Sequence, residues 1–353
     1  MTNARLAALL TTAAAVATLA LPGRKAHGPH GDGRGDGRGE SAPVRASAAR
    51  VGLVFDVGGR GDKSFNDASF AGLERAEREL GVAAEVLEPA SSEDREAAMR
   101  LFAARGFDLV VGVGFIFSSD IGRVAQDFPR VKFACVDYAP PPGPAPPNLA
   151  GLAFREEQGS FLVGAVAGQM TRTRQVGFVG GMQTPLVRKF EAGYRAGVAA
   201  VCPDCAVHAA YAGTTPDAFK DPATGKAIAI AEIAEGADVL YHAAGATGHG
   251  VLEAAHDAGC MAIGVDADQY DEMPDTVVTS MIKRADVAVF DAIRTTAAGR
   301  FDGGMHVFGV ADGAVDYVHT GPHAARLPPA VIAEVERLRG LIAAGALAVP
   351  QAP

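Results

Sequence analysis

The side chains best suited to chemistry lie in the stretch VGLVFDVGGRGDKSFND, residues 51–67. An apolar run leads into a glycine-rich turn, after which an amphipathic helix begins. A strand, a turn and a helix start in this order can cradle a phosphate, because unpaired N–H groups at a helix N-terminus attract anions. The glycines here read GGxG rather than GxGxxG, and no Gly-Lys-Ser or Gly-Lys-Thr of a Walker loop follows.

Charge gives a second argument against a phosphate at this turn. Asp56 and Asp62 place negative charge where a pyrophosphate would lie, and Lys63 opposes them. We therefore expect an uncharged polar ligand, which offers hydroxyl groups to the carboxylates and a flat face to the ring of Phe65.

Cys202 and Cys205 form a CPDC motif, whose chemistry could be redox, metal binding or a disulfide. A redox-active pair opens a helix, whose N-terminal field lowers the thiol pKa, whereas this pair follows a predicted helix and precedes a strand. No second CxxC completes a zinc site. In an oxidising compartment we expect a structural disulfide, and we expect buried thiols at Cys135 and Cys260.

Composition limits the class of protein. The chain has 353 residues, of which 48% are hydrophobic, enough for one large or two medium globular domains. The formal net charge is -9, and no basic cluster with interleaved aromatic residues occurs. We therefore exclude a nucleic-acid-binding protein.

The N-terminus has the pattern of an export signal. Residues 1–26 combine Arg5 with the apolar run LAALLTTAAAVATLALP, which predicts a signal peptide, with a retained membrane anchor as the alternative. Residues 27–50 are rich in Gly, Arg, Asp and Ser and predict a disordered linker. No cysteine precedes Cys135, so we expect a periplasmic or extracellular protein without a lipid-bearing N-terminal cysteine.

The elements that must position these residues form two α/β series. From residue 51 to 138, short β-rich runs alternate with helical patterns, and this alternation predicts a parallel sheet with helices on both faces. The proline-rich run APPPGPAPPN predicts an extended connector. A second series begins near residue 150. Helices are expected at 68–80, 93–105, 119–127, 186–200, 225–235 and 248–258.

Both series begin with a strand, a glycine turn and a helix that carries Phe and Gly close together. We therefore predict two similar lobes joined at a hinge, with a ligand between them at the carboxyl ends of the strands. The predicted N-terminal lobe comprises residues 51–138 and about 285–310. The predicted C-terminal lobe comprises about 150–284 and 311–345.

Five blocks in order carry a family resemblance: FDVGGRGDKSFNDASFAGLERA, VGFVGGMQTPLVRKFEAGYRAGV, GADVLYHAAGATGHGVLEAA, AIGVDADQY and VVTSMIK. They closely resemble the basic membrane protein family, substrate-binding components of ABC importers related to the purine nucleoside receptor of spirochaetes. The resemblance covers about residues 50–320. It implies a type I periplasmic binding protein fold, a purine nucleoside or similar small polar ligand, and an ABC permease as partner. It implies neither a cofactor nor a metal, and we expect a monomer.

A nucleoside offers a planar base, so its receptor needs flat apolar faces. Phe65 could stack on the base or simply pack the turn, and Asn66 offers a donor and an acceptor to the base edge. Asp56 is either a base contact or a helix cap. By resemblance, Tyr241 completes a sandwich with Phe65, with a core tyrosine as the alternative, and Gly245 follows it in the pocket.

A nucleoside also offers ribose hydroxyls, which suit carboxylates at strand ends. Asp266, after an apolar strand, is expected to accept hydroxyl protons. Lys283 would neutralise Asp266 and donate to a hydroxyl, or form a hinge salt bridge without a ligand. Asp137, beside the hinge, is a further contact. Weaker candidates are Phe115, Asp120, Phe190 and Asp268.

Two other functions stay open. A metal-dependent nucleoside hydrolase would need aspartates that hold a metal near the first strand, and Asp56, Asp62 and Asp67 supply three. No GxSxG or HExxH motif occurs, however, and His242, His249 and His256 lack a ligand-set spacing. A ligand sensor for a membrane signalling partner would differ from a transport receptor only in what its closed form contacts.

Overall fold

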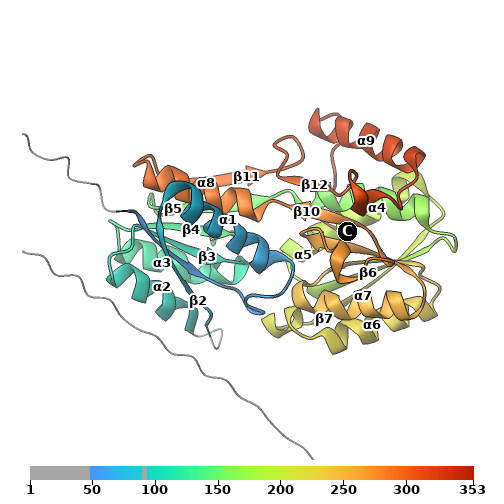
Figure 1. Cartoon of the computed structure of the whole chain (residues 1–353), viewed down its shortest axis with the longest axis horizontal. Coiled ribbons are helices and arrows are strands. Elements are labelled where there is room, and N and C mark those ends of the chain that lie inside the picture. Colours follow the sequence, from blue (N-terminus) through green and yellow to red (C-terminus); the bar gives the residue numbers. More distant parts are fainter. Residues whose placement is uncertain (1–47, 90–93) are drawn as a thin grey trace, which may run out of the picture. The chain divides into compact units, whose positions relative to one another are not determined.

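The computed structural model describes residues 48–89 and 94–353 (Figure 1). The predicted signal peptide and nearly all of the predicted linker lie outside the described residues. Arg50, expected to end the linker, is the first residue of strand β1 (Arg50–Val54).

The first lobe is built on a six-stranded parallel sheet in the order β11-β5-β4-β3-β1-β2. Helices α1 and α8 pack together on one face, and α2 and α3 pack on the other (Figure 1). Alternate residues of one strand therefore enter different cores: Val111 joins the α1 and α8 side, and Val110 the α2 and α3 side. The elements are β1, β2 (Ala83–Leu87), β3 (Leu109–Val113), β4 (Lys132–Val136), β5 (Leu149–Phe154), β11 (Gly304–Phe308), α1 (Phe65–Leu80), α2 (Asp94–Ala104), α3 (Ser118–Asp127) and α8 (Ala285–Ala297).

The second lobe has a sheet of the same size in the order β12-β10-β9-β8-β6-β7. Its strands are parallel except β12, which runs antiparallel to β10. The elements are β6 (Gln175–Met182), β7 (Ala206–Gly213), β8 (Val239–Ala243), β9 (Met261–Asp266), β10 (Val277–Lys283), β12 (Val315–Tyr317), α4 (Glu156–Met170), α5 (Pro185–Val201), α6 (Pro222–Ala234), α7 (Gly248–Asp257) and α9 (Pro329–Ala343).

The chain passes between the lobes three times, after β5, after β10 and after β11. The predicted lobe boundary needs one correction. Strand β5 was expected in the C-terminal lobe, but it pairs with β4 and β11 in the first sheet. The proline-rich segment 139–148 therefore links two neighbouring strands of one sheet, and the first crossing comes later, between Phe154 and Glu156.

Glycines allow α4, the helix that follows the first crossing, to pack closely against α5. A Cβ atom at Gly193 would overlap the backbone oxygen of Glu157, and one at Gly164 would overlap the backbone oxygen of Tyr194.

We expect Gly193→Ala to lower the free energy of unfolding by about 1–3 kcal/mol, because the helices must separate. Chemical denaturation measures this. Gly340→Ala is the matched control, since a Cβ there meets nothing within 4 Å, and it should be neutral or stabilising.

Candidate functional site

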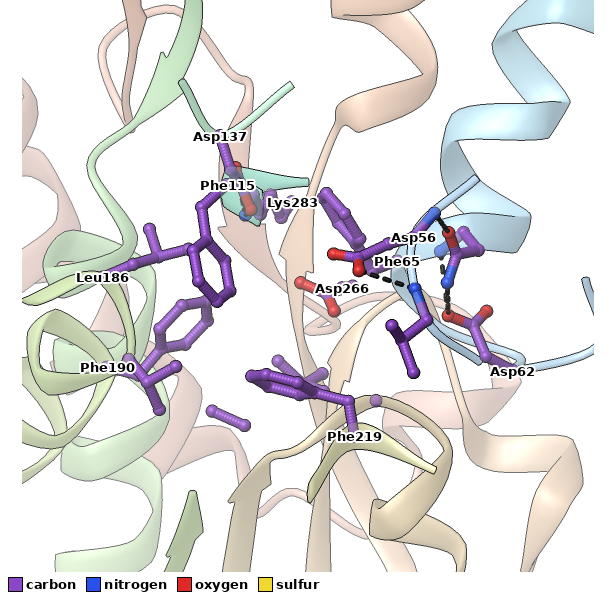
Figure 2. Close-up of a pocket in the computed structure, with 16 residues that line it drawn as sticks. Asp56, Asp62, Phe65, Phe115, Asp137, Leu186, Phe190, Phe219, Asp266 and Lys283 are labelled. Carbon is purple, nitrogen blue, oxygen red and sulfur yellow. Dashed lines mark hydrogen bonds and ion pairs between the residues drawn. The ribbon is translucent and has the colours of Figure 1, made fainter. Parts of the chain in front are cut away.

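A pocket lies between the lobes, at the carboxyl ends of the strands of both sheets (Figure 2). This is where open parallel sheets bind ligands, because the loops that follow successive strands meet there. The first lobe contributes Asp56, Val57, Asp62, Phe65, Asn66, Phe115 and Asp137. The second contributes Leu186, Val187, Phe190, Phe219, Ala243, Gly245, Val265 and Asp266, and Lys283 ends β10 at a crossing.

Both apolar and acidic side chains line this pocket. Figure 2 shows Phe115, Leu186 and Phe190 on one side, Asp56 and Asp62 on the other, and Asp266 between them. The arrangement suits a ligand with a flat apolar part and several hydrogen-bond donors.

Lys283 is a buried cation held by carboxylates at the hinge. Its Nζ lies 2.6 Å and 2.7 Å from the two carboxylate oxygens of Asp137 and 3.3 Å from Glu156 Oε1. Burial of the ammonium opposes its charge, but attraction by Asp137, Glu156 and Asp266 outweighs burial and raises the pKa of Lys283. Its Nζ also lies 4.8 Å from the centre of the Phe65 ring. The lysine is thus charged and joins residues of both lobes.

Asp137 and Asp266 lie at the carboxyl end of the fourth strand of each lobe: Asp137 directly follows β4, and Asp266 is the last residue of β9. Both have left-handed backbone, with φ of 61° and 65°, a conformation that Asp tolerates better than most residues. At Asp266 the turn is tight, because Ala267 N–H donates to the Val265 oxygen at 2.8 Å. Strained backbone of this kind is frequent at binding sites, where the surrounding structure holds it.

Asp266 carries a carboxylate oxygen that is free to accept. Its Oδ2 accepts from the Ser64 hydroxyl at 2.8 Å, across the two lobes. Its Oδ1 has no hydrogen-bond partner among the described residues. The residue is buried, with 8% of its surface exposed, so water has little access to this oxygen. Burial raises the pKa of Asp266, while Lys283 and the Ser64 hydroxyl favour its charged form. A ligand hydroxyl would satisfy Oδ1.

The side chain of Asp62, rather than that of Asp56, accepts the free N–H groups at the start of helix α1, whose N-cap residue is Ser64. Its two oxygens accept the backbone N–H groups of Ser64, Asn66 and Asp67 and the side-chain amide of Asn66, at 2.9–3.1 Å. Asn66 Oδ1 in turn accepts from Asp56 N–H at 3.1 Å. The Asn66 amide, predicted to read a base edge, is therefore engaged mainly in holding the loop that presents Phe65.

The aspartates of this loop are not gathered around a metal position. Asp67 accepts from the N–H groups of Gly61 and Lys63, and Asp62 is satisfied as described. Within residues 48–89 and 94–353, no group of three or more His, Cys, Asp or Glu side chains is placed to hold a metal ion.

Asp56 presents its second oxygen to the pocket. Oδ1 accepts from the N–H of Val57 at 2.6 Å, and the side chain stays partly accessible from the cavity. Burial within the cleft raises the pKa of Asp56 to about 7, although the Val57 N–H and the Arg95 charge oppose the shift. Asp56 can therefore accept or donate near neutral pH.

Tyr241, predicted to stack opposite Phe65, does not line the pocket, and that prediction is wrong. Its ring is fully buried between Tyr194 and Phe178, with centroids 5.1 Å and 5.7 Å away. Its hydroxyl lies 3.1 Å from Ser160 Oγ. Tyr241 lies within strand β8, so its side chain enters the core rather than the cleft at the strand end.

The second lobe instead places Phe219 and Phe190 in the pocket. Phe219 ends the short helix η2 (Pro216–Phe219) after β7, and it meets Phe115 of the first lobe with ring centroids 6.2 Å apart. Gly181 leaves room for the Phe219 ring, because a Cβ there would overlap it. The sequence signal for Phe219 was its place in the loop TTPDAFK, directly after a predicted strand.

Two weaker candidates lie outside the pocket. Asp120 accepts from Arg123 at 2.8 Å and lies 3.7 Å from Arg95. Asp268 binds His323 Nδ1 at 2.6 Å. Both carboxylates are thus engaged elsewhere. The pocket residues that we did not predict, besides Phe219, are Val57, Leu186, Val187, Ala243 and Val265.

The structure also gives the state of the cysteines and the apolar character of the described helices. The structure joins Cys202 and Cys205 in a disulfide after α5. The thiol of Cys135 is buried and that of Cys260 partly buried. In the part of the chain that the structure describes, none of the helices combines the length and apolar character that a membrane crossing requires.

The two sheets, the three crossings and the pocket between the lobes define a two-lobed α/β binding protein of the type I periplasmic kind. The solute-binding protein of an ABC transporter system from Aeropyrum pernix K1 has this fold, with a TM-score of 0.75 and 30% sequence identity. That match covers 86% of this chain and 94% of the Aeropyrum chain.

Residues 49–335 match the family described as PnrA-like ABC transporter substrate-binding protein, Bmp, and the chain belongs to this family. It is 34% identical to the CD4+ T-cell-stimulating antigen of Listeria innocua, over 86% of this chain and 88% of that protein. It is 32% identical to basic membrane protein A of Borreliella burgdorferi, over 76% of this chain and 79% of that protein. The resemblance drawn from the five sequence blocks is confirmed.

Proposed function

We propose that this protein is the extracytoplasmic receptor of an ABC importer and binds a purine nucleoside, or a similar small polar ligand, between its lobes. The observation that carries the proposal is the free Oδ1 of Asp266, which is buried in a pocket with phenylalanines from both lobes. A purine ring fits beside Phe65, Phe190 and Phe219, and a ribose hydroxyl fits at Asp266.

The acidic lining also predicts which ligands bind poorly. Asp56, Asp137 and Asp266 line the pocket together with one lysine, which Asp137 already neutralises. A nucleoside monophosphate would bring its negative charge among these carboxylates, so we propose that the unphosphorylated nucleoside is preferred.

Lobe closure on the ligand would create the surface that an ABC permease recognises. We propose export through the N-terminal signal and function as a monomer. Mass spectrometry of the exported protein would locate the mature N-terminus.

Isothermal titration with inosine, adenosine and guanosine tests the ligand assignment. We expect one-to-one binding of at least one nucleoside, weaker binding of its 5′-phosphate, and no free base by chromatography. Release of base that stops with a chelator would favour the hydrolase instead. Absence of binding by any nucleoside would remove the ligand from the proposal.

Phe219 gives a test of the stacking arrangement. Phe219→Ala should weaken nucleoside binding by about 5- to 150-fold, because stacking of a base on an aromatic ring is worth about 1–3 kcal/mol. Tyr241→Phe is the control and should leave the affinity unchanged, since the Tyr241 hydroxyl faces Ser160 in the core. Titration calorimetry on both variants decides between the two aromatic residues.

A further inference from the structure

Gln269 lies where the Asp266 loop of the second lobe meets the first lobe. It is 1% exposed, follows Asp266 by three residues, and is not among the residues that line the pocket. Both ends of its side-chain amide and its backbone N–H make hydrogen bonds. A buried glutamine so fully engaged has a structural or positioning role.

Within the second lobe, Gln269 holds the tight turn at Asp266. Its Oε1 accepts from Val265 N–H at 2.9 Å and lies 3.0 Å from His242 Nε2. Burial lowers the pKa of His242 to about 4, so the ring is neutral at pH 7, and Nε2 carries the proton in the tautomer that this contact requires. The backbone N–H of Gln269 donates to Ser280 Oγ at 3.0 Å.

The same amide reaches the first lobe. Gln269 Nε2 donates to the backbone oxygen of Lys63 at 3.2 Å, and the next residue, Ser64, donates its hydroxyl to Asp266 Oδ2. Lys63 has left-handed backbone, with φ of 51°. Residues 63 and 64 directly precede Phe65, so the loop that Gln269 contacts is the loop that presents this ring.

We propose that Gln269 is a positioning residue that couples the geometry of Asp266 to closure of the two lobes. One end of its amide fixes the Asp266 turn, and the other end binds the Phe65 loop of the opposite lobe. Because the contact joins protein atoms, it favours the closed form whether or not a ligand is bound. The proposal rests on the proposed function only in taking Asp266 as a ligand contact.

The test replaces Gln269 by leucine, which has a similar volume and no hydrogen-bonding group. Small-angle X-ray scattering would give the radius of gyration without ligand and with saturating inosine. We expect Gln269→Leu to be more open in solution without ligand. Loss of one neutral hydrogen bond should lower the closed-to-open ratio about fivefold and inosine affinity by a similar factor.

Ser280→Ala is the matched control. It removes the acceptor of the hydrogen bond from the Gln269 backbone N–H, and both of these residues belong to the second lobe. A residue that merely supports the loop would give the same result in both variants. We expect Ser280→Ala to keep the radius of gyration of the natural protein. If Gln269→Leu fails to fold, Gln269→Asn replaces it, because the shorter amide cannot span Val265 and Lys63.

Equal radii for Gln269→Leu and the natural protein in both conditions would overturn the proposal, as would identical opening in Ser280→Ala. These outcomes are separate from the ligand assignment. If the natural protein binds no nucleoside, the proposed ligand fails, while the ligand-free scattering comparison still decides the role of Gln269.

Discussion

Replacing Lys283 by methionine is expected to lower the free energy of unfolding by about 3–5 kcal/mol at pH 7.5. The lysine is 2% exposed and pairs with Asp137 and Glu156. Its removal leaves the buried carboxylate of Asp137 without a counter-charge among the described residues, whereas Glu156 keeps Lys189 at 3.0 Å. Chemical denaturation of the two proteins measures the difference. An unchanged midpoint and slope at pH 7.5 would contradict the electrostatic role assigned to the hinge lysine.

The effect of Lys283→Met should depend on pH in a defined direction. Burial already raises the pKa of Asp137 to about 6, even though Lys283 opposes the shift. Without the lysine this pKa rises further. A carboxyl group whose pKa is higher in the folded state than in the unfolded state destabilises the protein at pH values above the folded-state pKa. This destabilisation disappears as the pH falls toward the pKa of the unfolded state.

The difference in unfolding free energy between Lys283→Met and the natural protein should therefore shrink between pH 7.5 and pH 5. Lys226→Met is the matched control. Lys226 lies at the surface of α6, where it pairs with Asp257 at 2.8 Å, so its replacement should change stability little at either pH.

Asp266→Ala is expected to weaken nucleoside binding by about tenfold to a hundredfold. A hydrogen bond between a hydroxyl and a charged carboxylate contributes about 1.5–3 kcal/mol, and Oδ1 has no competing partner among the described residues. Titration calorimetry at pH 7.5 measures the loss.

Asp268→Ala controls for the loss of a carboxylate from the same loop. Asp268 binds His323 outside the pocket, so this variant should keep the nucleoside affinity of the natural protein. Equal losses in both variants would indicate that loop stability, rather than a contact at Asp266, governs binding.

The sequence predicted the two α/β lobes because most of their elements have clear local signals. Each of the six expected helices is present, with ends within three residues of those expected. Helix α4 escaped prediction because nearly all its residues are buried, which removes the polar stripe that reveals an amphipathic helix. Strand β5 was placed in the wrong lobe, because sequence order does not say which sheet a strand joins.

The site was predictable where residues follow a strand directly. Asp137 and Asp266 lie at the carboxyl ends of buried strands, and the structure brings both to the pocket with Lys283. Tyr241 failed because the prediction needed the orientation of a side chain within a strand that is buried on both faces. Phe219 was missed because it does not follow β7 directly, and the loop from residue 214 to 221, although it begins at the strand end, carries no pattern that shows where it folds back.

A crystal structure of the protein with a bound nucleoside would test the central claim most directly. We expect the base between Phe65 of the first lobe and Phe219 of the second, with a ribose hydroxyl within about 2.5–3.0 Å of Asp266 Oδ1. A nucleoside bound elsewhere, or a closed cleft whose ligand avoids both phenylalanines and Asp266, would contradict the account.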